Sequence, residues 1–381
     1  MERPSNSWTG FGHLDRDSKQ YKRMQNLLSL ANFEYLKSYA ITTRTSQRSL
    51  PPNISCVIDP SKFPWGFNNV VLEVALSDGV YWIARVQHAP TDDGARDEEG
   101  GDVAFVSEIA TMNLVRSRTK IPVPQVSLYV NRISARDTAV FSRDRYLHNI
   151  TLKLLNGIGR VVARTHSGKT GLELIPSALD GATGIQNTSL EYFNQSREAE
   201  NRETLAAHPD DADWLTACWV LKIAINHIVI KEKIQGPFPL CHLDLHHGNL
   251  LFDKEFNLTG VLDWSHAQSA PFERLAISQE FMTFPALSDE ENRPIIEFKK
   301  LVAQSLKRKE EQAAPQLEQN PAAQIRLSEF LGSPRSDIAY FCVYSNPRRA
   351  LWDAERACKL MYGEDISWEH LRQVYGNKPL P

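Results

Sequence analysis

Two runs of β-branched and aromatic residues in the first third of the chain predict a β-hairpin. The runs are Val70 to Leu76 and Val80 to Val86, and Ser77-Asp78-Gly79 lies between them. An Asp-Gly pair favours a tight turn, because glycine readily adopts the positive φ angle that hairpin turns need. The pattern therefore indicates two antiparallel strands.

Elsewhere, apolar residues recur mostly at helical spacing and predict a mainly helical second half. The first 50 residues form a polar, helical lead-in. Helices are then predicted for Phe105–Arg116, Ile150–His166 and Trp214–Glu232, and for most of the chain after Ala270. On the third of these helices, Trp214 and Trp219 are interpreted as packing residues.

Polar stretches between these elements predict surface loops. Two of them are Pro90–Asp102 and Glu310–Gln324. In a third, charged stretch, Asn131–Asn149, only Thr138–Phe141 resembles a strand. We expect the boundary between two domains near residues 130–145.

Composition narrows the possible functions. The 381 residues include 43 basic and 46 acidic side chains, so the net charge of about −3 gives no basic field for binding nucleic acid. Five cysteines without CxxC spacing favour a reducing compartment. The N-terminus has no apolar signal segment, and polar residues interrupt the longest apolar stretch, Trp214 to Ile230. We expect a soluble, cytoplasmic protein that is not bound to membranes.

The candidate chemistry lies in residues 241–264, which read CHLDLHHGNLLFDKEFNLTGVLDW. A hairpin formed by Leu250–Phe252 and Leu258–Leu262 would return the chain to its starting end. Asp263 would then face Asn249, and Asp244 would lie on the same loop. Two carboxylates and an amide oxygen suit a hard divalent cation, and a carboxylate beside a hydroxyl can accept its proton. The pattern favours phosphoryl transfer.

This segment resembles the catalytic loop of the aminoglycoside phosphotransferase and choline kinase-like family, whose fold is similar to that of protein kinases. The family pattern H-x-D-x-x-x-x-N falls on His242, Asp244 and Asn249, and its metal aspartate falls on Asp263. The resemblance implies an enzyme that uses ATP and Mg²⁺ to phosphorylate a hydroxyl of a small molecule. Asp244 would be the base, Asn249 and Asp263 would bind the metal, and His242 would support the loop backbone.

The upstream sequence resembles fungal-type members of the family. The run WGFNNVV places Gly66 and Asn68 in the turn that covers the nucleotide phosphates. The resemblance implies that Arg85 neutralises those phosphates and that Glu108 steadies it. Arg85 stands where most kinases have lysine, which changes the reach and geometry of the cation. The short Asn131–Asn149 stretch also leaves little sequence for the strand and hinge that bind adenine.

Other interpretations remain open. His242, Asp244 and His246 would share one face of an extended strand, as in a metallohydrolase, although no comparable ligand cluster is found elsewhere. Ser167-Gly168-Lys169-Thr170 resembles the end of a phosphate-binding loop, but its predicted context is helical. The chain could also be a kinase-like scaffold with an impaired nucleotide pocket. Ser265 and His266, which follow the metal aspartate, receive no role.

The expected architecture is a two-lobed α+β fold of the protein-kinase type. A helical lead-in, residues 1–50, precedes an N-lobe, residues 51–135, built on an antiparallel sheet that binds nucleotide. The C-lobe, residues 136–381, is mainly helical and carries the catalytic loop and the substrate-binding helices. The resemblance covers roughly residues 60–285 and is most specific over 238–272.

Overall fold

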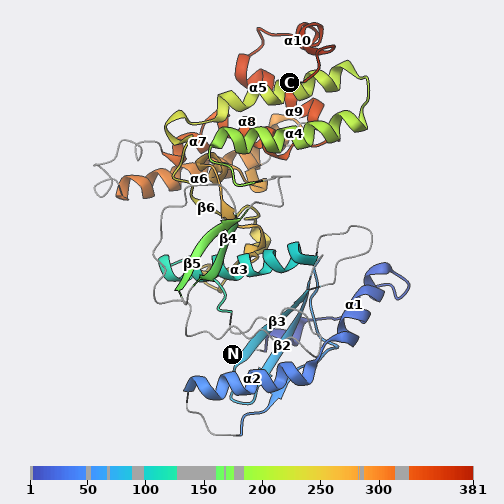
Figure 1. Cartoon of the computed structure of the whole chain (residues 1–381), viewed down its shortest axis with the longest axis vertical. Coiled ribbons are helices and arrows are strands. Elements are labelled where there is room, and N and C mark those ends of the chain that lie inside the picture. The colour runs from blue at the N-terminus through green and yellow to red at the C-terminus, as the bar shows by residue number, and fades with distance from the viewer. Residues whose placement is uncertain are drawn as a thin grey trace. The chain divides into compact units, whose positions relative to one another are not determined.

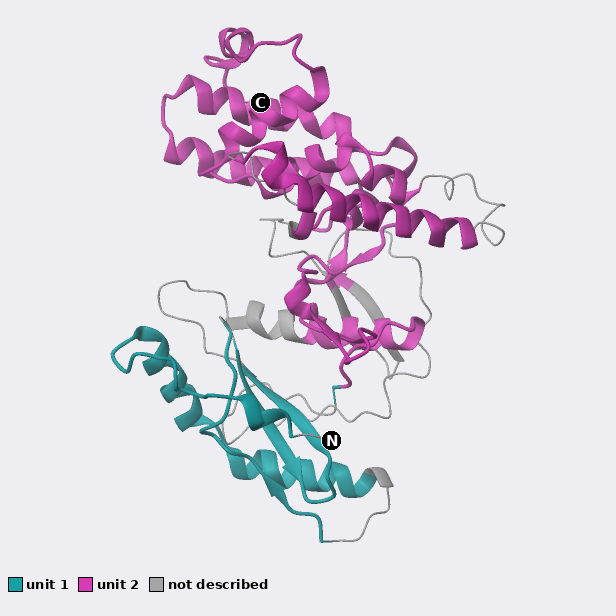
Figure 2. Ribbon diagram, turned by 180° about the vertical axis from the view of Figure 1, so that it is seen from behind, with its two compact units in different colours: residues 1–102, 126–145 teal, residues 103–125, 146–381 magenta. Residues whose placement is uncertain are grey.

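The structure is a computed structural model of the whole chain, and it describes residues 3–48, 53–66, 69–87, 98–126, 160–166, 169–175, 184–281, 283, 287–313 and 326–380. It divides into two compact units (Figure 2). The first comprises residues 1–102 and 126–145, and the second residues 103–125 and 146–381. None of the helices in the described ranges combines the length and the apolar run that crossing a bilayer requires.

The first unit packs two helices against a three-stranded antiparallel sheet. The strands follow the order β1-β2-β3, and β2 pairs with β3 from Asn69↔Gln87 to Ala75↔Tyr81. Gly79 adopts φ +80° in the turn, which confirms the predicted hairpin and the need for glycine there. The elements are α1 (Lys19–Leu30), α2 (Phe33–Arg48), β1 (Cys56–Val57), β2 (Asn69–Leu76) and β3 (Tyr81–Gln87).

Alternation along β2 explains how this unit is held together. Val70, Leu72, Val74 and Leu76 are buried and lie with Met24 of α1 in one apolar cluster. Because side chains alternate along a strand, these four residues share one face. The lead-in helices are therefore part of the packed unit.

The second unit begins within α3 (Glu98–Arg118), which is longer than the predicted helix Phe105–Arg116. The prediction of a loop over Pro90–Asp102 is wrong for residues 98–102, which are helical. Residues 90–97 lie outside the described part. Acidic side chains and glycine suggested a loop, but acidic residues are also favourable in the first turn of a helix, where they face the positive end of its dipole.

A second correction concerns the predicted helix Ile150–His166. Its last seven residues form β4 (Arg160–His166), which pairs in antiparallel fashion with β5 (Lys169–Ile175), and residues 150–159 lie outside the described part. Val161, Val162 and Thr165 are β-branched and favour a strand, whereas the periodicity of a short apolar run does not separate strand from helix. Lys169 and Thr170 thus lie in a strand rather than in a phosphate-binding loop.

Helices build most of the second unit (Figure 1). The central one is α5, which contacts α4, α8, α9 and α10 and buries Ala217, Leu221 and Ala224 completely. The helices are α4 (Ser189–Ala207), α5 (Ala212–Ile228), α6 (Asp289–Ala313), α7 (Leu327–Leu331), α8 (Pro334–Tyr344), α9 (Ala350–Tyr362) and α10 (Trp368–Tyr375).

The predictions for these helices hold with two adjustments. The helix predicted to reach Glu232 ends at Ile228, where Arg335 of α8 donates hydrogen bonds to the backbone oxygens of residues 227–229. The loop predicted over Glu310–Gln324 is helical up to Ala313, and residues 314–324 lie outside the described part. The packing role of the tryptophans is confirmed: Trp214 stacks on His208 and Trp219 on Tyr375.

Candidate active site

Two small antiparallel pairs position the candidate catalytic loop. In the first, β6 (Leu240–Cys241) pairs with β9 (Gln268–Ser269). In the second, β7 (Leu250–Phe252) pairs with β8 (Leu258–Val261), which confirms the predicted hairpin. The 3-10 turn η3 (His247–Asn249) leads into β7, and η4 (Trp264–His266) follows β8. The predicted site residues of this loop therefore lie on short segments tied to paired strands.

His242 supports the segment that precedes Asp263. Its Nε2 lies 2.7 Å from the backbone oxygen of Leu262, and its ring meets Trp264 edge-on with centroids 4.7 Å apart. Since a carbonyl only accepts, Nε2 carries the proton of this bond. Trp264 is buried, and its indole N–H donates to the backbone oxygen of Val261 at 3.0 Å. The sequence assigned a support role to His242, and its contacts with Leu262 and Trp264 are of that kind.

Asn249 is buried, and its amide has a defined orientation. Nδ2 donates to the backbone oxygen of Asp244 at 2.9 Å, so the amide group faces a carbonyl with its nitrogen. The Asn249 backbone oxygen accepts from the N–H of Leu262 at 2.8 Å. Oδ1, at the other end of the amide, keeps its lone pairs on the side away from the Asp244 carbonyl. This orientation suits a neutral oxygen ligand for a hard cation.

The carboxylate of Asp244 is open to a ligand. About a third of its side chain is exposed (34%), and Oδ2 lies 3.9 Å from Nε2 of His246, beyond hydrogen-bond distance. His246 in turn accepts a bond at Nδ1 from the N–H of Gly248 at 3.0 Å. The short loop thus presents the partly exposed carboxylate of Asp244 near the hydrogen-bonded ring of His246.

Asp263 adopts a backbone conformation that is uncommon for residues other than glycine. Its φ and ψ of 56° and 62° lie in the left-handed region, which costs a residue with a Cβ roughly 1–2 kcal/mol. Ser265 donates a hydrogen bond from Oγ to Oδ1 of Asp263 at 2.6 Å. Sequence reasoning gave Ser265 no role, although serine two residues after aspartate is a spacing at which such local bonds form.

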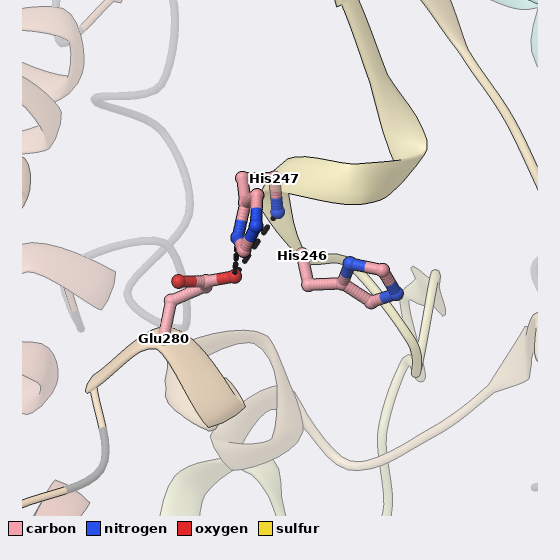
Figure 3. A group of neighbouring side chains, drawn as sticks. All are labelled: His246, His247 and Glu280. Atoms are coloured by element: carbon pink, nitrogen blue, oxygen red, sulfur yellow. Dashed lines mark hydrogen bonds and ion pairs between the residues drawn. The ribbon is translucent and has the colours of Figure 1, made fainter.

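A contact from the following segment was not foreseen. The turn η6 (Gln279–Phe281) brings Glu280 to the candidate catalytic loop, where Oε1 accepts from the backbone N–H of His247 at 3.0 Å and from its Nδ1 at 2.7 Å (Figure 3). The backbone and then the ring N–H of His247 hold the pKa of Glu280 below its usual value. Nothing in the spacing of Glu280 along the chain signals this contact.

The metallohydrolase interpretation rests on a wrong premise. Strand β6 ends at Cys241, so His242, Asp244 and His246 do not alternate along one strand. Within the described residues a different group, His246, His247 and Glu280, brings three ligand atoms within 4.8 Å of one another.

The predicted nucleotide-binding residues lie on other elements. Gly66 is exposed, and its N–H donates to the backbone oxygen of Asn69 at 2.9 Å, while Asn68 lies outside the described residues. Arg85 is on β3, opposite Val71, and Glu108 is buried on α3. Because they belong to different units, the ion pair between Arg85 and Glu108 stays a prediction. The strand-like run Thr138–Phe141 also lies outside the described residues.

Comparisons with known proteins point to one family. Residues 61–292 match the sequence model described as the phosphotransferase enzyme family. A relative named clavilactone A biosynthesis cluster protein Y, from Ampulloclitocybe clavipes, is 25% identical over 240 residues, or 53% of this chain and 59% of that protein. The chain thus spans less than two thirds of this relative.

A solved structure of a macrolide 2'-phosphotransferase type I aligns with 89% of this chain and 95% of its own, at 12% identity and a TM-score of 0.30.

Proposed function

The chain belongs to the phosphotransferase enzyme family, and on this premise we propose that it transfers a phosphoryl group from ATP to a hydroxyl of a small molecule. The observation that carries the proposal is the loop geometry: Asn249 is buried with its nitrogen on the Asp244 carbonyl, while the Asp244 carboxylate remains open. Family membership implies a kinase-like fold, and the chain mixes helices with antiparallel sheets.

In this proposal each loop residue has one task. Asp244 orients the acceptor hydroxyl and takes its proton, and His242 keeps the segment before Asp263 in place. Asn249 and Asp263 would hold Mg²⁺ through oxygen atoms. The fit rests on the amide orientation of Asn249, which directs Oδ1 away from the Asp244 carbonyl. Bound Mg²⁺ would supply neutralisation of the phosphate charge.

The nucleotide side is proposed from the resemblance. Gly66 and Asn68 would cover the phosphates, and Arg85, steadied by Glu108, would neutralise them. We also propose that residues 51–135 act as the N-lobe and 136–381 as the C-lobe of a two-lobed arrangement, after the lead-in 1–50. Five free thiols favour a reducing, cytoplasmic setting.

The decisive experiment measures ATP consumption with a panel of small hydroxyl compounds, including specialised metabolites because of the relative's name. We expect Asp244→Asn to lower kcat by at least about a hundredfold, since it removes the base. Glu255→Gln, at an exposed position in the β7–β8 turn, is the matched control and should leave kcat unchanged. Equal turnover by wild type and Asp244→Asn would refute the assignment.

Arg85 in place of the usual lysine favours a second candidate, a kinase-like binding or scaffold protein with an impaired nucleotide pocket. Thermal-shift measurements with Mg²⁺ and ATP separate the two candidates, because a ligand that binds only the folded protein raises its stability. A shift that Asp263→Asn abolishes supports the enzyme. No shift at millimolar nucleotide supports the scaffold.

A further inference from the structure

The catalytic loop is held from outside by the segment that follows β9. Ser278 donates from Oγ to the backbone oxygen of Leu245 at 3.3 Å, and Glu280 accepts from the backbone N–H of His247 at 3.0 Å. The N–H of Glu280 donates to Oγ of Ser278 at 3.2 Å, which joins the two contacts. Two residues of one segment therefore form hydrogen bonds to the loop on either side of His246.

We propose that Glu280 is a positioning residue that fixes the catalytic loop between Asp244 and Asn249. This inference rests on the proposed function, because it concerns the geometry of the same site. His247 lies three residues after Asp244 and two before Asn249. A fixed backbone N–H at His247 limits how far the two functional residues can move relative to each other. Small displacements of such groups lower the rate of a reaction steeply.

The backbone bond is the important part of the contact. The side chain of His247 is 89% exposed, and that of Glu280 is 33% exposed. An ion pair between exposed side chains contributes little, because water screens it and both chains lose freedom. The backbone N–H of His247, unlike an exposed side chain, cannot rotate away from the carboxylate. A hydrogen bond to an ionised acceptor is also stronger than one to a neutral acceptor.

A metal site is the competing interpretation of these residues. The ligand atoms of His246, His247 and Glu280 lie within 4.8 Å of one another. However, Nδ1 of His246 already accepts from the N–H of Gly248 at 3.0 Å, and Nε2 lies 3.2 Å from Nδ2 of Asn249. Figure 3 shows the His246 ring extending away from the Glu280 carboxylate. A metal bound at Nδ1 would break the bond that His246 accepts from the Gly248 N–H.

Three variants test the proposal. Glu280→Ala should lower kcat by about ten- to a hundredfold, with a smaller change in the KM for ATP. Glu280→Gln should recover most of the rate, because its Oε1 can still accept from the His247 N–H. His247→Ala removes only the exposed ring contact and should keep at least about a third of the rate. A kcat for Glu280→Ala within about twofold of wild type would overturn the inference.

A second measurement does not depend on turnover. We call the contacts that Ser278 and Glu280 make with the loop the clamp. Hydrogen exchange of the backbone amide of His247 should accelerate at least about tenfold in Glu280→Ala and remain near wild type in Glu255→Gln, because opening of the clamp exposes the amide. Unchanged exchange would refute the clamp even if the protein transfers no phosphate. Conversely, if exchange is faster in the variant but the wild type transfers no phosphate, the clamp is supported and the proposed function is refuted.

The effect of zinc on thermal stability distinguishes a metal site at these residues from the clamp. We expect ZnCl₂ to change the melting temperature of wild type and Glu280→Ala equally. A stabilisation of the wild type alone would assign the three side chains to a metal site instead.

Discussion

At the scale of single residues, the candidate catalytic loop has a close steric contact at Gly248. A Cβ added to Gly248 would lie 2.8 Å from Cε1 and 3.0 Å from Nδ1 of His246. The φ angle of Gly248 is not positive, so its need for glycine is steric. The missing side chain lets the His246 ring lie against the loop backbone.

Gly248→Ala should therefore displace the His246 ring and, with it, the amide of Asn249. We expect kcat for phosphoryl transfer to fall by about tenfold or more, with little change in melting temperature because the position is exposed. Gly184→Ala is the matched control, since a Cβ there meets no atom within 4 Å. Steady-state kinetics and thermal melting of both variants check the prediction. An unchanged kcat in Gly248→Ala would show that the ring position is unimportant.

At the scale of elements, a buried carboxylate joins the N-terminal segment to the sheet of the first unit. Glu73 of β2 is 3% exposed, accepts from the backbone N–H of Ser5 at 2.8 Å, and also accepts from Nε of Arg3. Burial raises the pKa of Glu73, but the bonds from Arg3 and Ser5 outweigh this effect, and the net pKa lies below the usual value. The segment before α1 is thus tied to the sheet by charge-assisted bonds.

This pKa shift predicts a pH-dependent stability. A carboxylate whose folded-state pKa is lowered stabilises the protein above the unfolded-state pKa, and it loses this effect as the pH falls through the folded-state value. Glu73→Gln should destabilise the first unit by about 1–3 kcal/mol at pH 7 and less in acid. Denaturant unfolding at several pH values checks this, with the exposed Glu34→Gln on α2 as control. A constant difference across pH would contradict the assignment.

At the scale of the whole molecule, the cysteines distinguish the two units. Cys56 is half-buried in the first unit, whereas Cys218, Cys241, Cys342 and Cys358 are buried in the second. Burial raises the pKa of Cys218 to about 11 and those of Cys241 and Cys342 to about 12. The thiolate is the reactive form of cysteine. These buried thiols are therefore protected from reagents both because they are inaccessible and because their raised pKa keeps them protonated.

Thiol labelling should therefore report on the second unit. In the native protein, a thiol reagent at pH 8 should modify Cys56 first, and the other four only as the second unit unfolds. Mass spectrometry of labelled peptides along a denaturant series checks the order. Early modification of Cys241, next to the catalytic loop, would show that β6 opens locally without global unfolding.

The sequence by itself determined the local features whose physical cause is local. The Asp-Gly turn, the β-branched runs of β2 and β3 and the apolar face of α5 specify their elements through neighbouring residues. The order His242, Asp244, Asn249 and Asp263 likewise predicted the family, because the chemistry requires those groups at short spacings. Where a short run was compatible with two periodicities, as at residues 160–166, local pattern was insufficient and pairing with β5 decided the outcome.

Only the tertiary structure decided which groups orient the predicted site. Glu280 follows His247 by 33 residues, and no periodicity links them. The left-handed conformation of Asp263, its bond from Ser265 and the close approach of Gly248 to His246 depend on how the backbone folds around the loop. The contact of Glu280 arises from positions in space rather than spacing along the chain, which is why the sequence identified the candidate site residues and His242 but not Glu280.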